Sequence, residues 1–391
     1  MNNKQLQYMA PVIQQEIDSN SIAGASLLVI HNNEEVYRET FGFADKENKK
    51  PIAKDTIFRL YSMTKPVTSV ASMILYERGL LDLNAPVSKY LDGFKNQKVY
   101  TEQGLVDVTR EVTIQDLLNM TSGVVYPDGS YYVGTLMQEL YDEVDRKENS
   151  GERVDTLTFC NQIGQKPLEF QPGECWRYGA SADIMGAVIE VITGKKFSQY
   201  LQDEIFTPLG MVDTGFYVPE EKLNRFSLIY EYKDDVKNIV PFDWNFLGLR
   251  DYSTPPAFES GGAGLVSTID DYSKFTSMLV NHGIYNGVRI LGKKTIEYIS
   301  TNQLTDIQAK GYNWPQLQGY GYANLMRTMI NKELAKSNGS IGEYGWDGWA
   351  GNYFFIDPKE NLIMIYMIQK CGGTNPEVTN KLRSIIYSSL E

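Results

Sequence analysis

A serine and a lysine three positions apart carry the strongest chemical signal in this sequence. Residues 61–65 read YSMTK, so that Ser62 precedes Lys65 by three positions. Positions i and i+3 of a helix share one face, so the Lys65 amine can reach the Ser62 hydroxyl. A serine hydroxyl is a poor nucleophile until a base removes its proton. The pair therefore predicts a serine nucleophile with a lysine base.

The residues that follow predict a helix over 62–79. Pro66 lacks an N–H and is tolerated in the first turn of a helix, so the helix cannot begin much before Ser62. Ser62 then lies near the positive end of the helix dipole, which favours a developing alkoxide. The alternative interpretation is a solvent-exposed helix start, with Ser62 as its cap and Lys65 in water.

Composition narrows the class of protein. The 391 residues, 42% hydrophobic and 22% charged, are typical of a soluble globular protein. A net charge of −12 disfavours nucleic acid or an anionic membrane as partner. The sequence contains no apolar run that could span a bilayer, and its N-terminus lacks the apolar stretch of a signal peptide. Three cysteines without C-x-x-C spacing fit structural thiols, and together these features predict a cytoplasmic protein.

The two histidines, His31 and His282, are placed in a polar turn and at a helix end, where a structural role is expected. A Ser-His-Asp triad and a histidine-ligated zinc are therefore disfavoured, and we expect no metal or cofactor. Catalysis would have to use lysine, tyrosine or carboxylates.

Strand patterns occur at both ends of the chain and helical patterns between them. This arrangement predicts an α/β fold of the α+β type, in which a mainly antiparallel sheet is flanked by helices. We expect one unit over 1–391, with the sheet region in 1–80 and 258–391 and a mostly helical region in 81–257. The expected elements are hairpins at 25–30 with 35–41 and 353–356 with 362–368, and helices near 113–120, 181–192 and 376–390.

Residues 227–258 are crowded with aromatic side chains. They either pack within loops and core or line an apolar substrate cleft, and the sequence leaves both interpretations open. They include Tyr230, Tyr232, Phe242, Trp244, Phe246 and Tyr252.

Three further segments strengthen the case for catalysis. ECWRYG at 174–179 places Tyr178 just before a helix, FESGGAG at 258–264 is a glycine cluster, and GWDGWAG at 345–351 is a glycine-rich strand. With the serine–lysine pair, they resemble the penicillin-recognising serine hydrolases, which include class C β-lactamases, DD-peptidases and family VIII carboxylesterases. The resemblance covers about residues 20–370 and implies a β-lactamase-like fold.

The resemblance also implies roles for particular residues. Ser62 matches the acylated nucleophile, Lys65 its base, and Tyr178 the tyrosine that relays a proton to the leaving group. The backbone N–H groups of Ser62 and Trp349 would form the oxyanion hole. Substrate-binding residues Trp346, Asp347 and Gly348 occupy the place of a Lys-Thr-Gly motif.

Two departures from the penicillin-binding pattern place the chain closest to the esterase branch. Ala180 replaces the asparagine of Tyr-x-Asn, and Trp346 replaces the lysine that attracts a substrate carboxylate. Asp347 either points out of the strand or faces the cleft and selects neutral or cationic substrates. We expect a carboxylesterase acting on small neutral esters, or an acyltransferase. The alternatives are a β-lactamase or D-amino-acid peptidase or amidase, and a catalytically silent binding protein.

Overall fold

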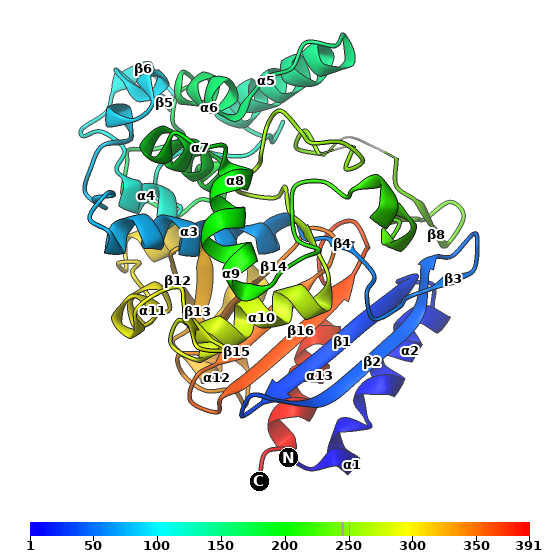
Figure 1. Ribbon diagram of the computed structural model, residues 1–391. Coiled ribbons are helices and arrows are strands. Elements are labelled where there is room, and N and C mark those ends of the chain that lie inside the picture. Colours follow the sequence, from blue (N-terminus) through cyan, green and yellow to red (C-terminus); the bar gives the residue numbers. More distant parts are fainter. Residues whose placement is uncertain (244–245, 250) are drawn as a thin grey trace.

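The computed structural model describes residues 1–243, 246–249 and 251–391. An eight-stranded antiparallel sheet forms its centre, with strand order β12-β13-β14-β15-β16-β1-β2-β3 (Figure 1). Strands β1 and β16 pair from Ala25 opposite Ile368 to His31 opposite Leu362, which joins the two ends of the chain in one sheet. The strands are β1 (Gly24–His31), β2 (Glu34–Asp45), β3 (Lys50–Pro51), β12 (Tyr320–Ala323), β13 (Met326–Met329), β14 (Tyr344–Asp347), β15 (Tyr353–Asp357) and β16 (Leu362–Ile368).

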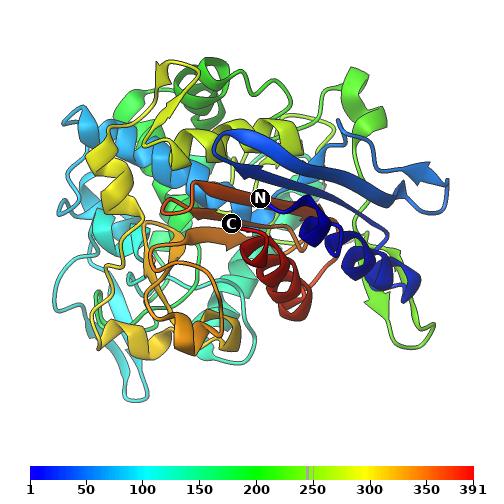
Figure 2. The ribbon, with the colours of Figure 1, turned by 90° about the horizontal axis from the view of Figure 1, so that it is seen from below.

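Helices cover both faces of the sheet, which explains why β16 is apolar and buried at every position. Helices α2 (Met9–Asp18) and α13 (Pro376–Ser388) pack together and cover one face. Helices α3 (Lys65–Glu77) and α10 (Ile269–Val280) lie on the other. The view from below shows the strands between α13 and α10 (Figure 2).

Most of the remaining helices fall between β3 and β12 along the chain. They are α1 (Asn3–Leu6), α4 (Ile114–Leu118), α5 (Tyr132–Asn149), α6 (Thr156–Gly164), α7 (Ser181–Thr193), α8 (Phe197–Leu201), α9 (Thr207–Leu209), α11 (Lys293–Ile299) and α12 (Lys332–Ala335). Four small strand pairs, which the sequence did not predict, complete the fold. They are β4 (Phe58–Arg59) with β9 (Val266–Ser267), β5 (Lys98–Thr101) with β6 (Gly104–Asp107), β7 (Tyr230–Lys233) with β8 (Asn238–Pro241), and β10 (Ile284–Tyr285) with β11 (Val288–Arg289).

Local sequence signals account for several element boundaries. Both expected hairpins are present, as β1–β2 and β15–β16. Helix α4 begins with a capping box between Thr113 and Asp116, and α7 ends at Gly194, whose φ of 67° favours glycine. The expected helix over 62–79 begins differently, because residues 61–64 form a 3₁₀ turn and the α-helix starts at Lys65.

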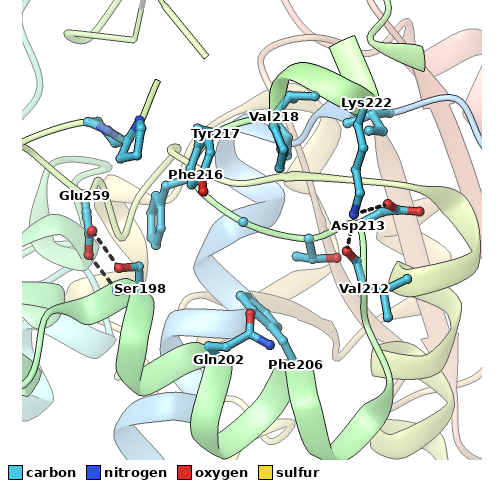
Figure 3. Close-up of a pocket in the computed structure, with 17 residues that line it drawn as sticks. Ser198, Gln202, Phe206, Val212, Asp213, Phe216, Tyr217, Val218, Lys222 and Glu259 are labelled. Atoms are coloured by element: carbon cyan, nitrogen blue, oxygen red, sulfur yellow. Dashed lines mark hydrogen bonds and ion pairs between the residues drawn. The ribbon is translucent and has the colours of Figure 1, made fainter. Parts of the chain in front are cut away.

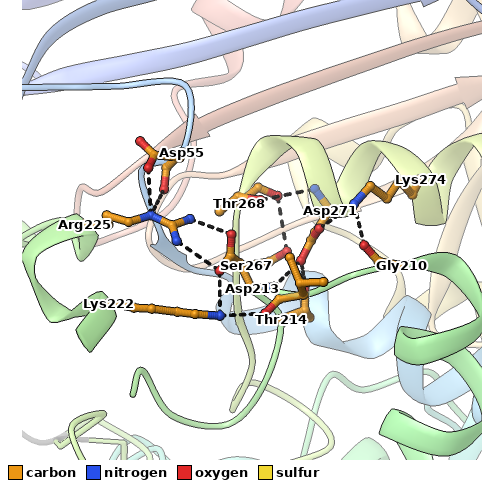
Figure 4. Close-up of polar contacts among 11 residues, drawn as sticks. Asp55, Gly210, Asp213, Thr214, Lys222, Arg225, Ser267, Thr268, Asp271 and Lys274 are labelled. Carbon is orange, nitrogen blue, oxygen red and sulfur yellow. Dashed lines mark hydrogen bonds and ion pairs between the residues drawn. The ribbon is translucent and has the colours of Figure 1, made fainter. Parts of the chain in front are cut away.

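A polar network attaches the segment after α9 to the β4–β9 pair and α10 (Figure 4). Asp213 accepts hydrogen bonds from Arg225 and forms an ion pair with Lys222 at 2.9 Å. Asp271 of α10 accepts from the Asp213 backbone N–H at 2.6 Å and from the Thr214 hydroxyl at 3.1 Å. These contacts keep the segment against the buried helices.

Among the described helices, none has both the length and the apolar character needed to cross a lipid bilayer.

Candidate active site

Ser62 lies in a strained turn at the entrance to α3. The residue before it, Tyr61, has a φ of 45°, a left-handed conformation that residues other than glycine rarely adopt. Tyr61 is 2% exposed and packs against Trp349, with ring centroids 5.1 Å apart. Such strain persists where surrounding packing holds it, and it is typical of functional sites. The turn places Ser62 on the wall of a cavity of about 390 Å³.

Lys65 is fully buried and hydrogen-bonds three oxygens. Its Nζ lies 3.2 Å from Ser62 Oγ, 3.1 Å from Tyr126 Oη and 2.8 Å from the Gly262 carbonyl. The contact expected from the three-residue spacing is therefore present. The alternative of a lysine in water is wrong, because Lys65 is 0% exposed.

Burial changes the protonation of Lys65. Loss of hydration lowers the pKa of Lys65 to about 7, and the carboxylates of Asp183 and Asp347 oppose this shift. A large fraction of the side chain is thus neutral near pH 7. A neutral amine has one lone pair and two N–H donors. It can accept the Ser62 proton while donating to Tyr126 and the Gly262 carbonyl.

Tyr126 is a site residue that the sequence analysis missed. Its hydroxyl accepts from Lys65 and donates to Asp183 Oδ2 at 3.4 Å. Burial raises the pKa of Tyr126 well above its usual value, so the phenol is neutral. Asp183 Oδ1 accepts from the Ser260 hydroxyl at 2.5 Å and from the Gly262 N–H at 2.9 Å.

One sequence signal could have pointed to this arrangement. Asp183 lies in the first turn of α7, a mostly apolar helix that is buried through that turn. A buried carboxylate needs hydrogen-bond donors or a cation. Tyr126 itself, one of 26 tyrosines, carries no local signal.

Tyr178 approaches the nucleophile from the segment before α7. Its hydroxyl accepts from Trp346 Nε1 at 3.2 Å and is hydrogen-bonded to Ser62. Its ring centroid lies 4.5 Å from Lys65 Nζ, whereas the phenol hydroxyl that Lys65 hydrogen-bonds belongs to Tyr126. Burial raises the pKa of Tyr178, so the phenol keeps its proton at neutral pH and can donate it.

The residues at the place of the Lys-Thr-Gly motif lie outside the described lining of the cavity beside Ser62. Trp346 is 1% exposed and supports Tyr178 from the core, and Asp347 lines a second cavity of about 340 Å³ together with Arg327. Neither side chain is in the described lining beside Ser62, and their contact with substrate stays a prediction. Successive residues of a strand point to opposite faces, which accounts for the burial of Trp346 in the core while Asp347 reaches the second cavity.

Gly348 brings the backbone after β14 close to the segment that carries Ser62. A Cβ on Gly348 would lie 2.3 Å from the Leu60 carbonyl oxygen, so only glycine allows this close approach. The approach brings Trp349 to the same cavity wall as Ser62. Participation of their N–H groups in an oxyanion hole stays a prediction.

The cavity wall is rich in aromatic rings, which are Tyr61, Tyr126, Tyr141, Tyr178, Phe246, Trp314 and Trp349. Of the aromatic segment at 227–258, Phe246 thus lines the cavity. Phe242 packs against Trp349, with ring centroids 5.3 Å apart, whereas Tyr230 and Tyr252 are buried and Tyr232 is exposed. Trp244 lies outside the described residues.

A third cavity, of about 220 Å³, has none of Ser62, Lys65 and Tyr178 in its lining (Figure 3). Its acidic side chains already have protein partners. Glu259 accepts from the Ser198 N–H at 2.6 Å and hydroxyl at 2.7 Å, and Asp213 pairs with Lys222. We assign no chemistry to this cavity.

The sheet that joins both termini, with a serine and a lysine at the start of a buried helix, defines the β-lactamase fold of serine hydrolases. The family model described as Beta-lactamase matches residues 9–386, and the chain belongs to this family.

Known proteins of several kinds resemble this chain. Protein Rv1367c of Mycobacterium tuberculosis is 30% identical over 373 residues, covering 92% of this chain and 88% of its own. Esterase EstB of Burkholderia gladioli is 28% identical over 393 residues, covering 96% and 94%. The solved structure of EstCE1, a hydrolase with promiscuous acyltransferase activity, matches with a TM-score of 0.83 at 24% identity, covering 98% and 99%.

Proposed function

We propose that this protein is a carboxylic ester hydrolase that acts on small esters through a Ser62 acyl-enzyme. The observation that carries the proposal is a buried lysine, with a pKa of about 7, placed 3.2 Å from Ser62 Oγ at an aromatic cavity. The similarity to esterase EstB over nearly the whole chain supports the same reaction. Transfer of the acyl group to an alcohol instead of water would use the same intermediate.

In the acylation step, neutral Lys65 takes the Ser62 proton as Oγ attacks the ester carbonyl. The negative charge that develops on the carbonyl oxygen is stabilised by the N–H groups of Ser62 and Trp349. Tyr126 orients Lys65 because it accepts one amine hydrogen and donates its own hydrogen to Asp183. The lone pair of Lys65 is thereby left for Ser62.

In the collapse of the intermediate, the Tyr178 phenol donates its proton to the leaving alkoxide. The Lys65 ammonium, 4.5 Å from the ring centroid, stabilises the resulting phenolate. In deacylation the phenolate takes a proton from the attacking water, and Lys65 returns its proton to Ser62 Oγ as that oxygen leaves. Deacylation runs in the reverse sense, with water in place of the alcohol. Trp346 fixes the Tyr178 hydroxyl through its indole N–H.

The cavity favours ester hydrolysis over β-lactam or peptide hydrolysis. Those substrates carry a carboxylate, and among the described residues that line the cavity none is lysine or arginine. The indole of Trp346 offers one N–H and no charge. A β-lactamase or D-amino-acid amidase is therefore the second candidate.

The test is a chain-length series of p-nitrophenyl esters run beside nitrocefin. We expect turnover of short esters with little or no nitrocefin hydrolysis, and an acyl adduct on Ser62 by mass spectrometry. Nitrocefin turnover comparable with the best ester would favour the second candidate. An intact protein that forms no adduct with any ester would instead be a silent binding protein.

A further inference from the structure

Among the described residues that line the cavity beside Ser62, the charged side chains are all carboxylates. Helix α5 contributes two carboxylates, Asp142 and Asp145, to the lining. Lysine and arginine are absent from the described part of this lining. Gln138, one helical turn before Asp142 and also in the lining, donates to Asp142 Oδ1 at 2.8 Å. This hydrogen bond joins the carboxylate to a second residue of the lining.

Much of the rest of this cavity lining consists of aromatic side chains. Phe246 stacks on Trp349 with centroids 4.1 Å apart and an interplanar angle of 16°. Trp314 and Tyr178 form a second aromatic pair, with ring centroids 5.3 Å apart. An aromatic face attracts a cation through its quadrupole, and tryptophan does so most strongly. A carboxylate near such rings adds Coulomb attraction for the same ion.

We propose that the preferred esters carry an ammonium group, held between these rings and Asp142. The proposal deepens the esterase function proposed above and rests on it. A cavity of about 390 Å³ is large enough for a small ester with such a group. Charge selection then lies in α5 and the aromatic walls, whereas Asp347 lines a different cavity.

The test compares two esters that differ only in charge. Acetylcholine and 3,3-dimethylbutyl acetate have the same shape, because a quaternary carbon replaces the quaternary nitrogen. Hydrolysis of both is followed by pH-stat titration. We expect kcat/KM to be about tenfold higher for the cationic ester at low salt. Added NaCl should lower this ratio, because Asp142 is exposed and its charge is screened.

Two variants of α5 separate this site from general surface charge. Asp142→Asn should lower the ratio about threefold. Glu139→Gln removes the same charge from the same helix at an exposed position outside the cavity lining, and should leave the ratio unchanged. A ratio of one or less in the unmodified protein would overturn the proposal, as would equal effects of the two substitutions.

A separate outcome concerns the esterase function itself. The esterase function would be refuted if the protein hydrolysed none of three esters: acetylcholine, 3,3-dimethylbutyl acetate and p-nitrophenyl acetate. The cation site is then tested alone, by titrating the tryptophan fluorescence of the Ser62→Ala protein with choline. Saturable quenching that weakens with Asp142→Asn would support the site, and absence of quenching would refute it.

Discussion

Replacing Asp183 by asparagine should move the pH dependence of ester hydrolysis to lower pH. Acylation needs neutral Lys65, so kcat/KM should rise as pH increases through the pKa of Lys65, about 7, and then level off. Burial lowers this pKa because the ammonium loses its hydration, whereas Asp183 raises it by attracting the ammonium. Removal of the carboxylate charge therefore lets the pKa of Lys65 fall further.

The size of the shift follows from the hydrogen-bonded chain. Tyr126 Oη lies 3.1 Å from Lys65 Nζ and 3.4 Å from Asp183 Oδ2, so the two charges are at most about 6.5 Å apart. At an effective dielectric constant of about 20, such charges interact by roughly 2.5 kcal/mol, or just under two pKa units. We expect the inflection to move down by about one to two pH units.

The assay is a pH profile of kcat/KM for a neutral p-nitrophenyl ester, with folding checked by thermal unfolding. Asp271→Asn is the matched control. Asp271 is as buried as Asp183, but it belongs to the network around Asp213 and Thr214. Asp271→Asn should change the stability of the protein without moving the inflection of the pH profile. An inflection that stays near pH 7 or rises in Asp183→Asn would refute the coupling between this carboxylate and the lysine.

Four further substitutions test other parts of the site. Ser62→Ala should lower ester turnover by several orders of magnitude with an unchanged melting temperature, and activity within tenfold of the unmodified protein would exclude Ser62 as nucleophile. Lys65→Arg should be almost inactive in the same assay, since a guanidinium cannot lose its proton; an active variant would limit Lys65 to an electrostatic role. Gly348→Ala should lower both the melting temperature and kcat, because its Cβ would meet the Leu60 carbonyl at 2.3 Å; normal values for both would contradict that contact. Asp347→Asn should change kcat/KM for neutral and carboxylate-bearing esters by the same factor, because Asp347 lines another cavity, and a selective gain for the anionic ester would return it to the cleft.

Local patterns in the sequence determined much of this molecule. The hairpins at both ends, the capped helix after Thr113, and the face shared by Ser62 and Lys65 all follow from interactions between residues a few positions apart. Hydrophobic periodicity, caps and i, i+3 spacing act over such short distances, so one sequence is enough to recognise them. The alternation of side chains in a strand also implies that Trp346 and Asp347 face opposite ways.

Tertiary structure alone decided which way each of those two residues faces, and which other side chains surround the nucleophile. Tyr126 and Asp183 are 57 positions apart, yet they meet beside Lys65. Their contact depends on how separate segments pack onto α3, and no local pattern encodes that packing. The pKa of Lys65 has the same origin, because it results from burial by several segments at once. The serine–lysine pair could therefore be predicted from the sequence. The environment that lowers the pKa of Lys65 exists only in the folded protein.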